Sequence, residues 1–178
     1  MSALAALRGA LIVALCAIAV AAAAATAVPA PSAPTAADPP MPAAIARRQI
    51  EAAVNRDWPA LKALYASDVV YADPGGEYRG IDATLKNLER SLEPFGGKID
   101  VTINHLYQGK DFAVVEWNAV AVNDRQFTLA DGTKAPATGN EVNLNIVTIY
   151  DLKDGRIVAE RNYYDGLAVY ASLGVLGE

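Results

Sequence analysis

The feature that most constrains the fold is a change of hydrophobic period at Gly96-Gly97. Before this glycine pair, apolar residues recur every three to four positions, which is the spacing of amphipathic helices. After it, apolar and polar residues alternate, which is the spacing of strands with two unlike faces. Helices followed by long strands predict an α+β domain, with a curved antiparallel sheet packed on N-terminal helices. The concave face of such a sheet is a favoured place for a ligand pocket.

The predicted elements fill one domain over residues 43–178. Asp57 is placed to cap the second helix, and Asp165 to cap the closing helix. Asp73 is expected in a turn between a short strand and the third helix. The expected helices cover residues 43–55, 57–65, 81–95 and 166–176, and the expected strands cover residues 69–71, 99–107, 112–122, 142–150 and 156–164.

The N-terminal segment has the pattern of a cleavable secretory signal peptide over residues 1–27. An unbroken apolar run at residues 11–25 follows Arg8 and ends at Ala25-Thr26-Ala27, which suits signal peptidase. We expect cleavage after Ala27, with Ala25 and Ala30 as alternatives. The competing interpretation is an uncleaved anchor helix, but the run is shorter than the roughly 20 residues of a membrane span. The predicted localisation is secreted or periplasmic.

The mature chain offers little for metal or redox chemistry. Residues 28–42, rich in Pro and Ala, are expected to form a disordered linker. Cys16, the only cysteine, lies in the segment to be removed, and one histidine without an acidic cluster makes no metal site, so no cofactor is expected. Losing Arg8 leaves 14 basic against 20 acidic residues, which argues against nucleic acid and anionic membranes as partners.

The direction of the side chains on the last two strands decides the pocket. Asn143 and Asn145 should face solvent, so Thr148 and the other even positions should face the interior. A three-residue loop at residues 153–155 would pair Thr148 with Glu160, and a two-residue Asp154-Gly155 turn would reverse the parity. We favour the first, because it agrees with the asparagine pattern. It places on the inner face Val158, Glu160, Asn162 and Tyr164.

Two side chains are candidates for proton transfer. His105 lies on the apolar face of its strand, and imidazole titrates near neutrality; the alternative is a hydrogen-bonded histidine near the sheet edge. Burial would raise the pKa of Glu160 and make it a base. The alternative for Glu160 is an ion pair with Arg47 or Arg48.

The remaining candidates would shape and orient the ligand. Asn162 would orient a carbonyl or hydroxyl group, or else be a hydrogen-bonded core amide. Aromatic residues on a curved sheet usually belong to the core first and to the ligand surface second. The predicted ligand-binding residues are Tyr164, Thr148, Trp117, Tyr71, Trp58 and Tyr65.

The last strand also carries a family resemblance. The segment Gly155-Arg156-Ile157-Val158-Ala159-Glu160-Arg161-Asn162-Tyr163-Tyr164-Asp165, followed by Leu173-Gly174, resembles the C-terminal signature of the SnoaL-like polyketide cyclase family, within the nuclear transport factor 2-like superfamily. Three further segments fit the same pattern: Tyr71-Ala72-Asp73-Pro74, Tyr78-Arg79-Gly80-Ile81 and Val115-Glu116-Trp117-Asn118. The resemblance implies a cone of four long strands with helices around a pocket.

The resemblance also implies where catalytic groups would lie. Catalytic cyclases of the family carry a general-base aspartate in the last strand, and this position is Asn162 here. Epoxide hydrolases of the superfamily carry an aspartate that falls on the same residue. Their Arg-x-Asp pair would fall on Trp117 and Ala119, so this chain lacks it.

Three roles fit these observations. A cyclase- or isomerase-like enzyme would move a proton with His105 or Glu160, while Asn162 and Tyr164 polarise an oxygen of a small apolar carbonyl compound. An exported binding protein would hold a small hydrophobic molecule without turnover, which the amide at 162 favours because it takes up no proton at neutral pH. A homodimer formed through the outer sheet face is the third, although asparagines make that face polar.

Overall fold

The computed structural model describes residues 41–129 and 131–175, so the predicted signal peptide and all of the predicted linker except residues 41 and 42 lie outside the described residues. All four predicted helices are confirmed. None of the helices in the described part of the chain is long and apolar enough to cross a membrane. The helices are α1 (Pro42–Val54), α2 (Trp58–Leu64), α3 (Ile81–Ser91) and α4 (Gly166–Ser172).

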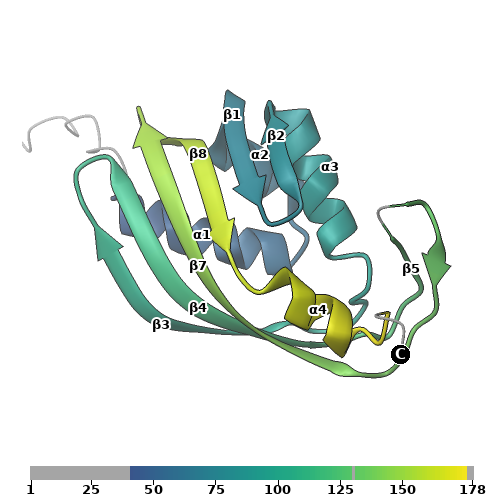
Figure 1. Cartoon of the computed structure of the whole chain (residues 1–178). Coiled ribbons are helices and arrows are strands. Elements are labelled where there is room, and N and C mark those ends of the chain that lie inside the picture. The colour runs from purple at the N-terminus through teal and green to yellow at the C-terminus, as the bar shows by residue number, and fades with distance from the viewer. Residues whose placement is uncertain (1–40, 130, 176–178) are drawn as a thin grey trace, which may run out of the picture. The chain divides into compact units, whose positions relative to one another are not determined.

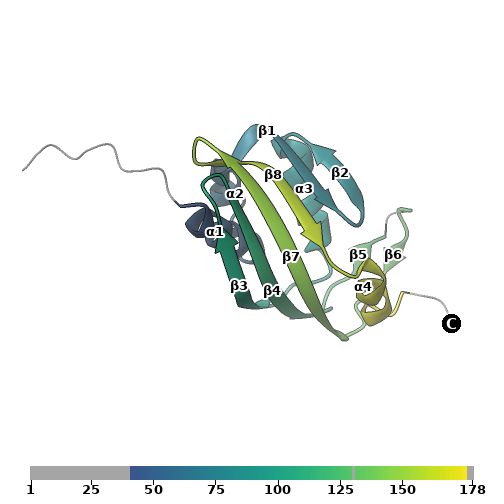
Figure 2. The same ribbon diagram turned by 60° about the vertical axis from the view of Figure 1, so that its left-hand side comes forward.

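Six strands form one sheet in the order β2-β1-β8-β7-β4-β3 (Figures 1 and 2). Neighbouring strands are antiparallel except β1 and β8, which run parallel. A two-stranded ribbon that the sequence did not predict interrupts the connection between β4 and β7. The strands are β1 (Tyr65–Asp73), β2 (Gly76–Arg79), β3 (Asp100–Gln108), β4 (Phe112–Val122), β5 (Phe127–Thr128), β6 (Lys134–Ala135), β7 (Glu141–Lys153) and β8 (Arg156–Tyr163).

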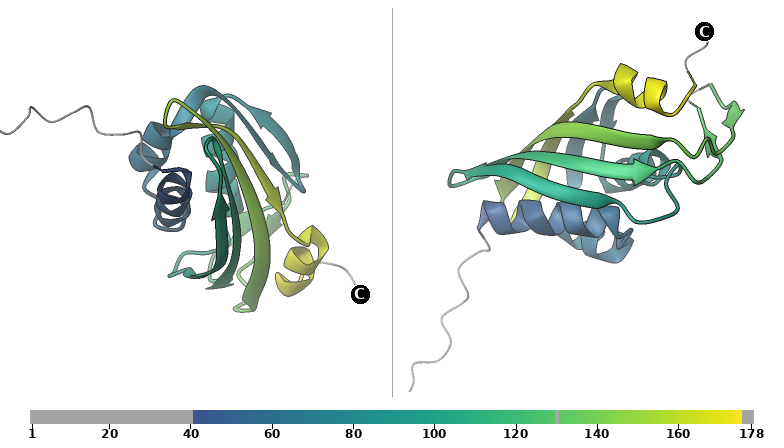
Figure 3. Two further views of the ribbon diagram at one scale, coloured as in Figure 1. Left: turned by 90° about the vertical axis from the view of Figure 1, so that its left-hand side faces the viewer. Right: turned by 90° about the horizontal axis from the view of Figure 1, so that it is seen from below.

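The sheet curves around the N-terminal helices, which confirms the α+β prediction (Figure 3). Helix α1 lies across β3, β4 and β7, and α3 packs against β1 and β2. The main core is apolar and lies between these helices and the concave face. The sheet stays open, because β2 and β3 form its two edges and do not pair with each other.

Three predicted local contacts are confirmed. Asp57 caps α2, since its Oδ1 accepts a hydrogen bond from the Ala60 amide at 3.0 Å. Asp165 caps α4 in the same way through the Ala168 amide at 3.0 Å. Asp73 is the last residue of β1 and borders the turn to β2, where its Oδ1 accepts from the Gly75 amide at 2.7 Å.

The predicted turn between β7 and β8 is wrong, but the predicted inner face of β8 is confirmed for its central residues. Lys153 pairs with Arg156, so the loop has two residues, Asp154 and Gly155, both with positive φ as a type I′ turn requires. This turn buries Ile157. A β-bulge at Val158 then restores the parity, because one extra residue reverses which side chains face the core.

After the bulge, Tyr150 pairs with Glu160 and Thr148 pairs with Asn162. The predicted pairing of Thr148 with Glu160 is therefore wrong by two residues, while both polar side chains of β8 are buried as predicted. Asn143 is exposed on the outer face, as predicted, and so is Asn145. Asn118 Nδ2 donates to both of them. A homodimer formed through this face stays a prediction.

Candidate functional site

A cavity of about 180 Å³, here called the inner cavity, lies between the concave face of the sheet and helices α1 and α3. Its walls are mostly aliphatic side chains such as Ile50, Leu88 and Ile146. A cavity of about 150 Å³ in another protein takes up benzene, so this space has room for one six-membered ring. Polar lining side chains are Gln49, Tyr71, Ser91, Trp117, Glu160, Asn162 and Tyr164.

Glu160 is the only carboxylate among the described residues that line this cavity, and it is 2% exposed. Its Oε1 accepts a hydrogen bond from Asn162 Nδ2 at 2.9 Å, and its Oε2 accepts one from the Tyr65 hydroxyl. No ion pair joins Glu160 to a basic side chain within residues 41–129 and 131–175. The predicted alternative, an ion pair with Arg47 or Arg48, is wrong: both arginines are exposed on the solvent side of α1.

Burial raises the pKa of Glu160 from 4.5 to about 7. The hydrogen bonds from Asn162 and Tyr65 limit this increase, and the negative charge of Asp73 adds to it. A carboxyl group with this pKa populates both protonation states at neutral pH, which is the condition for acid or base catalysis. Glu160 therefore combines a suitable pKa with a place on an apolar cavity.

One side of the Glu160 carboxyl group is held by a series of hydrogen bonds in which the donor and the acceptor of each bond are fixed. Trp117 Nε1 donates to Thr148 Oγ1 at 2.9 Å, and Thr148 Oγ1 donates to Asn162 Oδ1 at 2.7 Å. An indole N–H only donates, so the direction of the whole chain is set from Trp117 onward. The amide nitrogen of Asn162 must then point at Glu160 Oε1. Asn162 positions the carboxyl group rather than replacing it.

The other side is held by a second series of hydrogen bonds, which the sequence predicted only in part. The Tyr150 hydroxyl donates to Gln49 Oε1 at 2.8 Å, and Gln49 Nε2 donates to the Tyr65 hydroxyl at 2.9 Å. Tyr65 then donates to Glu160 Oε2. Burial raises the pKa of Tyr65 and of Tyr150, so both remain protonated donors at neutral pH. These residues with Trp117, Thr148, Asn162 and Glu160 are here called the Glu160 network.

Two further tyrosines line the inner cavity without a protein partner. Within residues 41–129 and 131–175, neither the Tyr71 hydroxyl nor the Tyr164 hydroxyl makes a hydrogen bond to the protein. Since no fully buried side-chain nitrogen or oxygen in these residues lacks a partner, both hydroxyls are open to the cavity. Burial raises the pKa of both groups, so each keeps its proton. Both hydroxyls are therefore donors available to an oxygen atom of a ligand.

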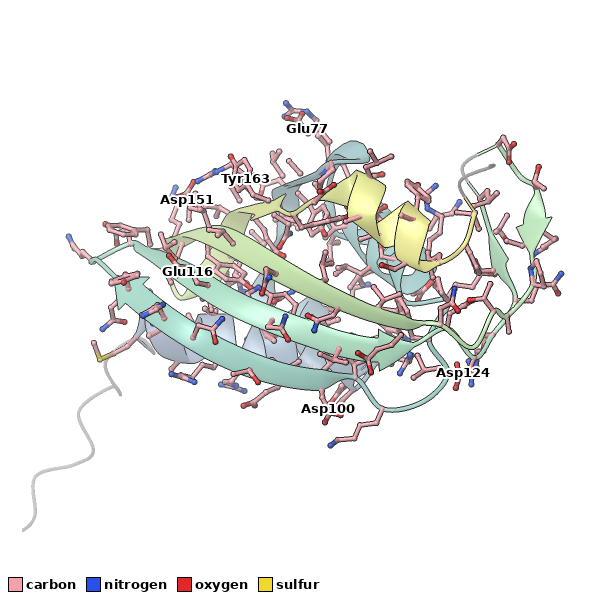
Figure 4. All side chains as sticks on the ribbon, turned by 60° about the horizontal axis from the view of Figure 1, so that its bottom comes forward. Glu77, Asp100, Glu116, Asp124, Asp151 and Tyr163 are labelled. Atoms are coloured by element: carbon pink, nitrogen blue, oxygen red, sulfur yellow. The ribbon has the colours of Figure 1, made fainter. Side chains whose placement is uncertain are left out.

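The predicted catalytic role of His105 assumed a side chain on the inner face of its strand. This assumption is wrong, because the side chain does not face the cavity. Ile103 pairs with Trp117, but His105 pairs with Glu116, so a β-bulge at Asn104 reverses the parity of β3. His105 Nδ1 lies 3.0 Å from Glu116 Oε2, and the two side chains are 60% and 48% exposed. Figure 4 shows Glu116 on the outer side of the sheet, the face opposite to helix α1.

The structure brings the other predicted residues together with one exception. Trp117, Tyr71, Asn162, Glu160 and Tyr164 line the inner cavity, and Thr148 and Tyr65 join the Glu160 network. Trp58 packs against the core outside the cavity lining. The described residues contain no group of three His, Cys, Asp or Glu side chains close enough to bind a metal ion.

Gln49 was missed, although the sequence carried a signal for it. It lies four residues after Ile45 and four before Ala53, on the apolar face of α1, and is 3% exposed. A long polar side chain in the middle of an apolar stripe needs a buried partner. Tyr150 was predicted on the inner face, but nothing in its strand showed that its hydroxyl would reach α1.

The raised pKa of Glu160 predicts that stability falls as pH rises. Between pH 4.5 and about 7, the folded state holds more of this proton than the unfolded state, so the free energy of unfolding decreases by about 3 kcal/mol from this group. Above pH 7 the contribution is constant. Urea unfolding of wild type and Glu160→Gln from pH 4.5 to 8.5 measures it. Equal pH slopes in the two proteins would contradict the prediction.

Thr148→Val is expected to lower the free energy of unfolding by about 1–3 kcal/mol. The change keeps the shape but leaves Trp117 Nε1 and Asn162 Oδ1 without partners at a fully buried position. Thr102→Val, at an exposed position of β3, is the matched control and should change stability by less than about 0.5 kcal/mol. Urea unfolding compares them, and similar losses in both variants would argue against the Glu160 network.

The comparisons with known proteins agree with this architecture. A family model described as the SnoaL-like domain matches residues 46–160. No curated protein matches the sequence. Among solved structures, the chain resembles IdmH of Streptomyces antibioticus, named as a polyketide cyclase, with TM-score 0.62 and 23% identity over 75% of this chain and 99% of that one.

Two further structures show the same likeness. One is a protein of Jannaschia sp. CCS1 named as a SnoaL-like polyketide cyclase, with TM-score 0.65 and 19% identity over 75% of this chain and 92% of that one. The other is an LEH-like epoxide hydrolase of M. tuberculosis, with TM-score 0.56 and 20% identity over 74% of this chain and 87% of that one. At these identities the likeness shows a shared fold, and the chemistry has to be argued from the site.

Proposed function

Because the chain belongs to the SnoaL-like domain family, we propose that it binds a small, largely apolar carbonyl compound and moves a proton on it with Glu160. The observation that carries the proposal is a buried carboxyl group without a cationic partner in the described residues, on the wall of an apolar cavity. Its pKa of about 7 suits a base that must also release its proton again.

The proposed step is the removal of a proton from the carbon next to the carbonyl group. The C–H bond breaks, its proton goes to the Glu160 carboxylate, and the electron pair moves to the carbonyl oxygen to give an enolate. The Tyr71 and Tyr164 hydroxyls, which have no protein partner in the described residues, would donate to that oxygen and stabilise its charge. Return of the proton to another carbon atom conjugated with the enolate completes an isomerisation. Attack of the enolate carbon on a second carbonyl group, with the Glu160 proton passing to the alkoxide that forms, completes a cyclisation.

Exchange of the α-protons of acetophenone in deuterium oxide tests the proposal without knowledge of the natural substrate. Its ring matches the size of the inner cavity, and exchange requires only the proposed step. Proton NMR of acetophenone with the purified full-length protein should show loss of the methyl signal faster than in buffer. Binding of acetophenone without faster exchange would remove the enzymatic part of the proposal.

The second candidate function is binding without turnover, and the specific observation that favours it is Asn162. The resemblance places the family's general base at this position, and an amide takes up no proton at neutral pH. The inner cavity would then hold its ligand through the same polar lining side chains, without chemical change. Mass spectrometry of small molecules that stay with the purified protein tests this candidate. An apolar carbonyl compound retained unchanged would support it.

We also propose that the protein is exported. The support is the signal-peptide pattern of residues 1–27 and the absence of cysteine from the rest of the chain. Expression in a bacterial host and N-terminal sequencing of the periplasmic or extracellular fraction should give a chain that begins at Val28, Thr26 or Pro31. A product that keeps Met1 and stays in the membrane fraction would instead support the anchor interpretation.

A further inference from the structure

A second hollow of about 490 Å³, here called the outer hollow, lies beside the inner cavity. It is lined by the turn after β1, the C-terminal part of α3, β5 and α4. Ser91, Tyr164 and Val169 line both spaces, so the two adjoin along these three residues. A ligand that fills the inner cavity therefore has a direction in which it can extend.

Arg90 is the only cationic side chain among the described residues that line the outer hollow. Its Nη2 donates to the Tyr78 hydroxyl and to Asn87 Oδ1, each at 3.1 Å. Asn87 is itself 4% exposed, and its Nδ2 donates to Asp73 Oδ2 at 2.9 Å. The guanidinium group is thus hydrogen-bonded to a buried amide and to a tyrosine hydroxyl, while Arg90 itself stays exposed at the rim of the hollow.

The charge of Arg90 has no acidic partner within residues 41–129 and 131–175. A guanidinium group has five N–H donors in a planar fork, and the two bonds to Tyr78 and Asn87 use only Nη2. Asp73, the one carboxylate among the described residues that line the hollow, already accepts from the Gly75 amide and the Asn87 side chain. An anchored cation with unused donors is suited to a carboxylate of the ligand.

We propose that the two spaces hold one bipartite ligand, with a carbonyl-bearing apolar ring in the inner cavity and a carboxylate bound by Arg90 in the outer hollow. The inference rests on the proposed function for the inner part and adds the substrate class: an apolar keto acid rather than a neutral ketone. Tyr164 lies at the boundary of the two spaces, so its hydroxyl would contact the ligand at the junction.

Calorimetric titration of the purified full-length protein with two matched series of phenyl ketones tests the inference. One series carries a terminal carboxylate after two to five methylene groups, and the other ends in a methyl group at the same length. We expect at least one keto acid to bind about tenfold or more tightly than its neutral counterpart. That advantage should disappear in Arg90→Gln. It should remain in Lys86→Gln, which removes an exposed cation one turn earlier on α3.

Arg90→Lys provides a second variant if the glutamine variant fails to fold. It keeps the charge but loses the fork, so we expect the keto-acid advantage to shrink without vanishing. Neutral ketones that bind as well as the keto acids would overturn the bipartite ligand and leave the inner cavity assignment intact. The same holds if the advantage survives Arg90→Gln. If neither series binds, the proposed function and this inference both fail.

Discussion

Glu160→Gln is expected to lower the protein-catalysed rate of α-deuterium exchange on acetophenone by about 10²–10⁴-fold, the usual contribution of a general base. Glutamine fills the same space but cannot accept the proton. The remaining rate enhancement would come from the two tyrosine hydroxyls acting on the carbonyl oxygen. Proton NMR at pH 8, where wild-type Glu160 is mostly ionised, gives the comparison at its most sensitive.

Two control variants separate a catalytic effect from a structural one. Glu116→Gln makes the same change on the exposed outer face and should leave the exchange rate unchanged. Tyr65→Phe removes a hydrogen bond that lowers the pKa of Glu160, so the midpoint of the pH–rate profile should move to higher pH. Exchange that continues at the wild-type rate in Glu160→Gln would show that another group, or solvent, takes the proton.

The glutamine variant should fold, because one arm of the Glu160 network can reverse. An amide nitrogen at position 160 would donate to the Tyr65 hydroxyl. Tyr65 would then donate to Gln49 Oε1, and Gln49 Nε2 to the Tyr150 hydroxyl, once the Gln49 amide turns over. The same reversal accommodates protonated Glu160 in the wild type. The arm through Trp117 cannot reverse, so Glu160 Oε1 accepts from Asn162 Nδ2 in both protonation states.

The fold could be predicted from the sequence because single β-bulges do not obscure the hydrophobic period of a whole helix or strand. The change of period at Gly96-Gly97 separates the helices from the long strands, and the inner face of β7 is marked by Asn143 and Asn145. The prediction for His105 failed because a β-bulge at Asn104 reverses the alternation, and alternation was its only support. A bulge leaves no mark in the period of a strand this short.

The site was predicted in part for a related reason. Glu160 was placed on the inner face through a wrong turn and a wrong pairing, because the bulge at Val158 cancels the effect of the two-residue turn. The contacts between elements had no local signal: Gln49 and Tyr150 meet across 101 positions of the sequence. Only the position of Gln49 on the apolar face of α1 indicated that a buried hydrogen-bond partner had to exist.

Asn162→Asp is expected to make the protein strongly pH-sensitive, because it places a second carboxyl group beside Glu160. The new Oδ1 would still accept from Thr148, but the other oxygen would replace the amide nitrogen that now donates to Glu160 Oε1 at 2.9 Å. Two buried carboxylates at that separation cannot both ionise without a large penalty, so the pair keeps one proton. The proton on the pair is then released only at higher pH than that of Glu160 alone.

The sign of this effect distinguishes it from an ordinary loss of stability. Carboxyl groups whose folded-state pKa is raised stabilise the protein at low pH and lose that contribution as pH rises. We therefore expect Asn162→Asp to match the wild type within about 1 kcal/mol at pH 4.5 and to be less stable by about 3–5 kcal/mol at pH 8.5. The wild-type slope should end near pH 7, whereas that of the variant should continue above it.

Asn145→Asp, on the exposed outer face, should show no such slope in urea unfolding. If the stability of Asn162→Asp is independent of pH, the two side chains do not meet in an enclosed, water-poor site. Glu160 would then lack the burial that raises its pKa, and its assignment as the base would fail.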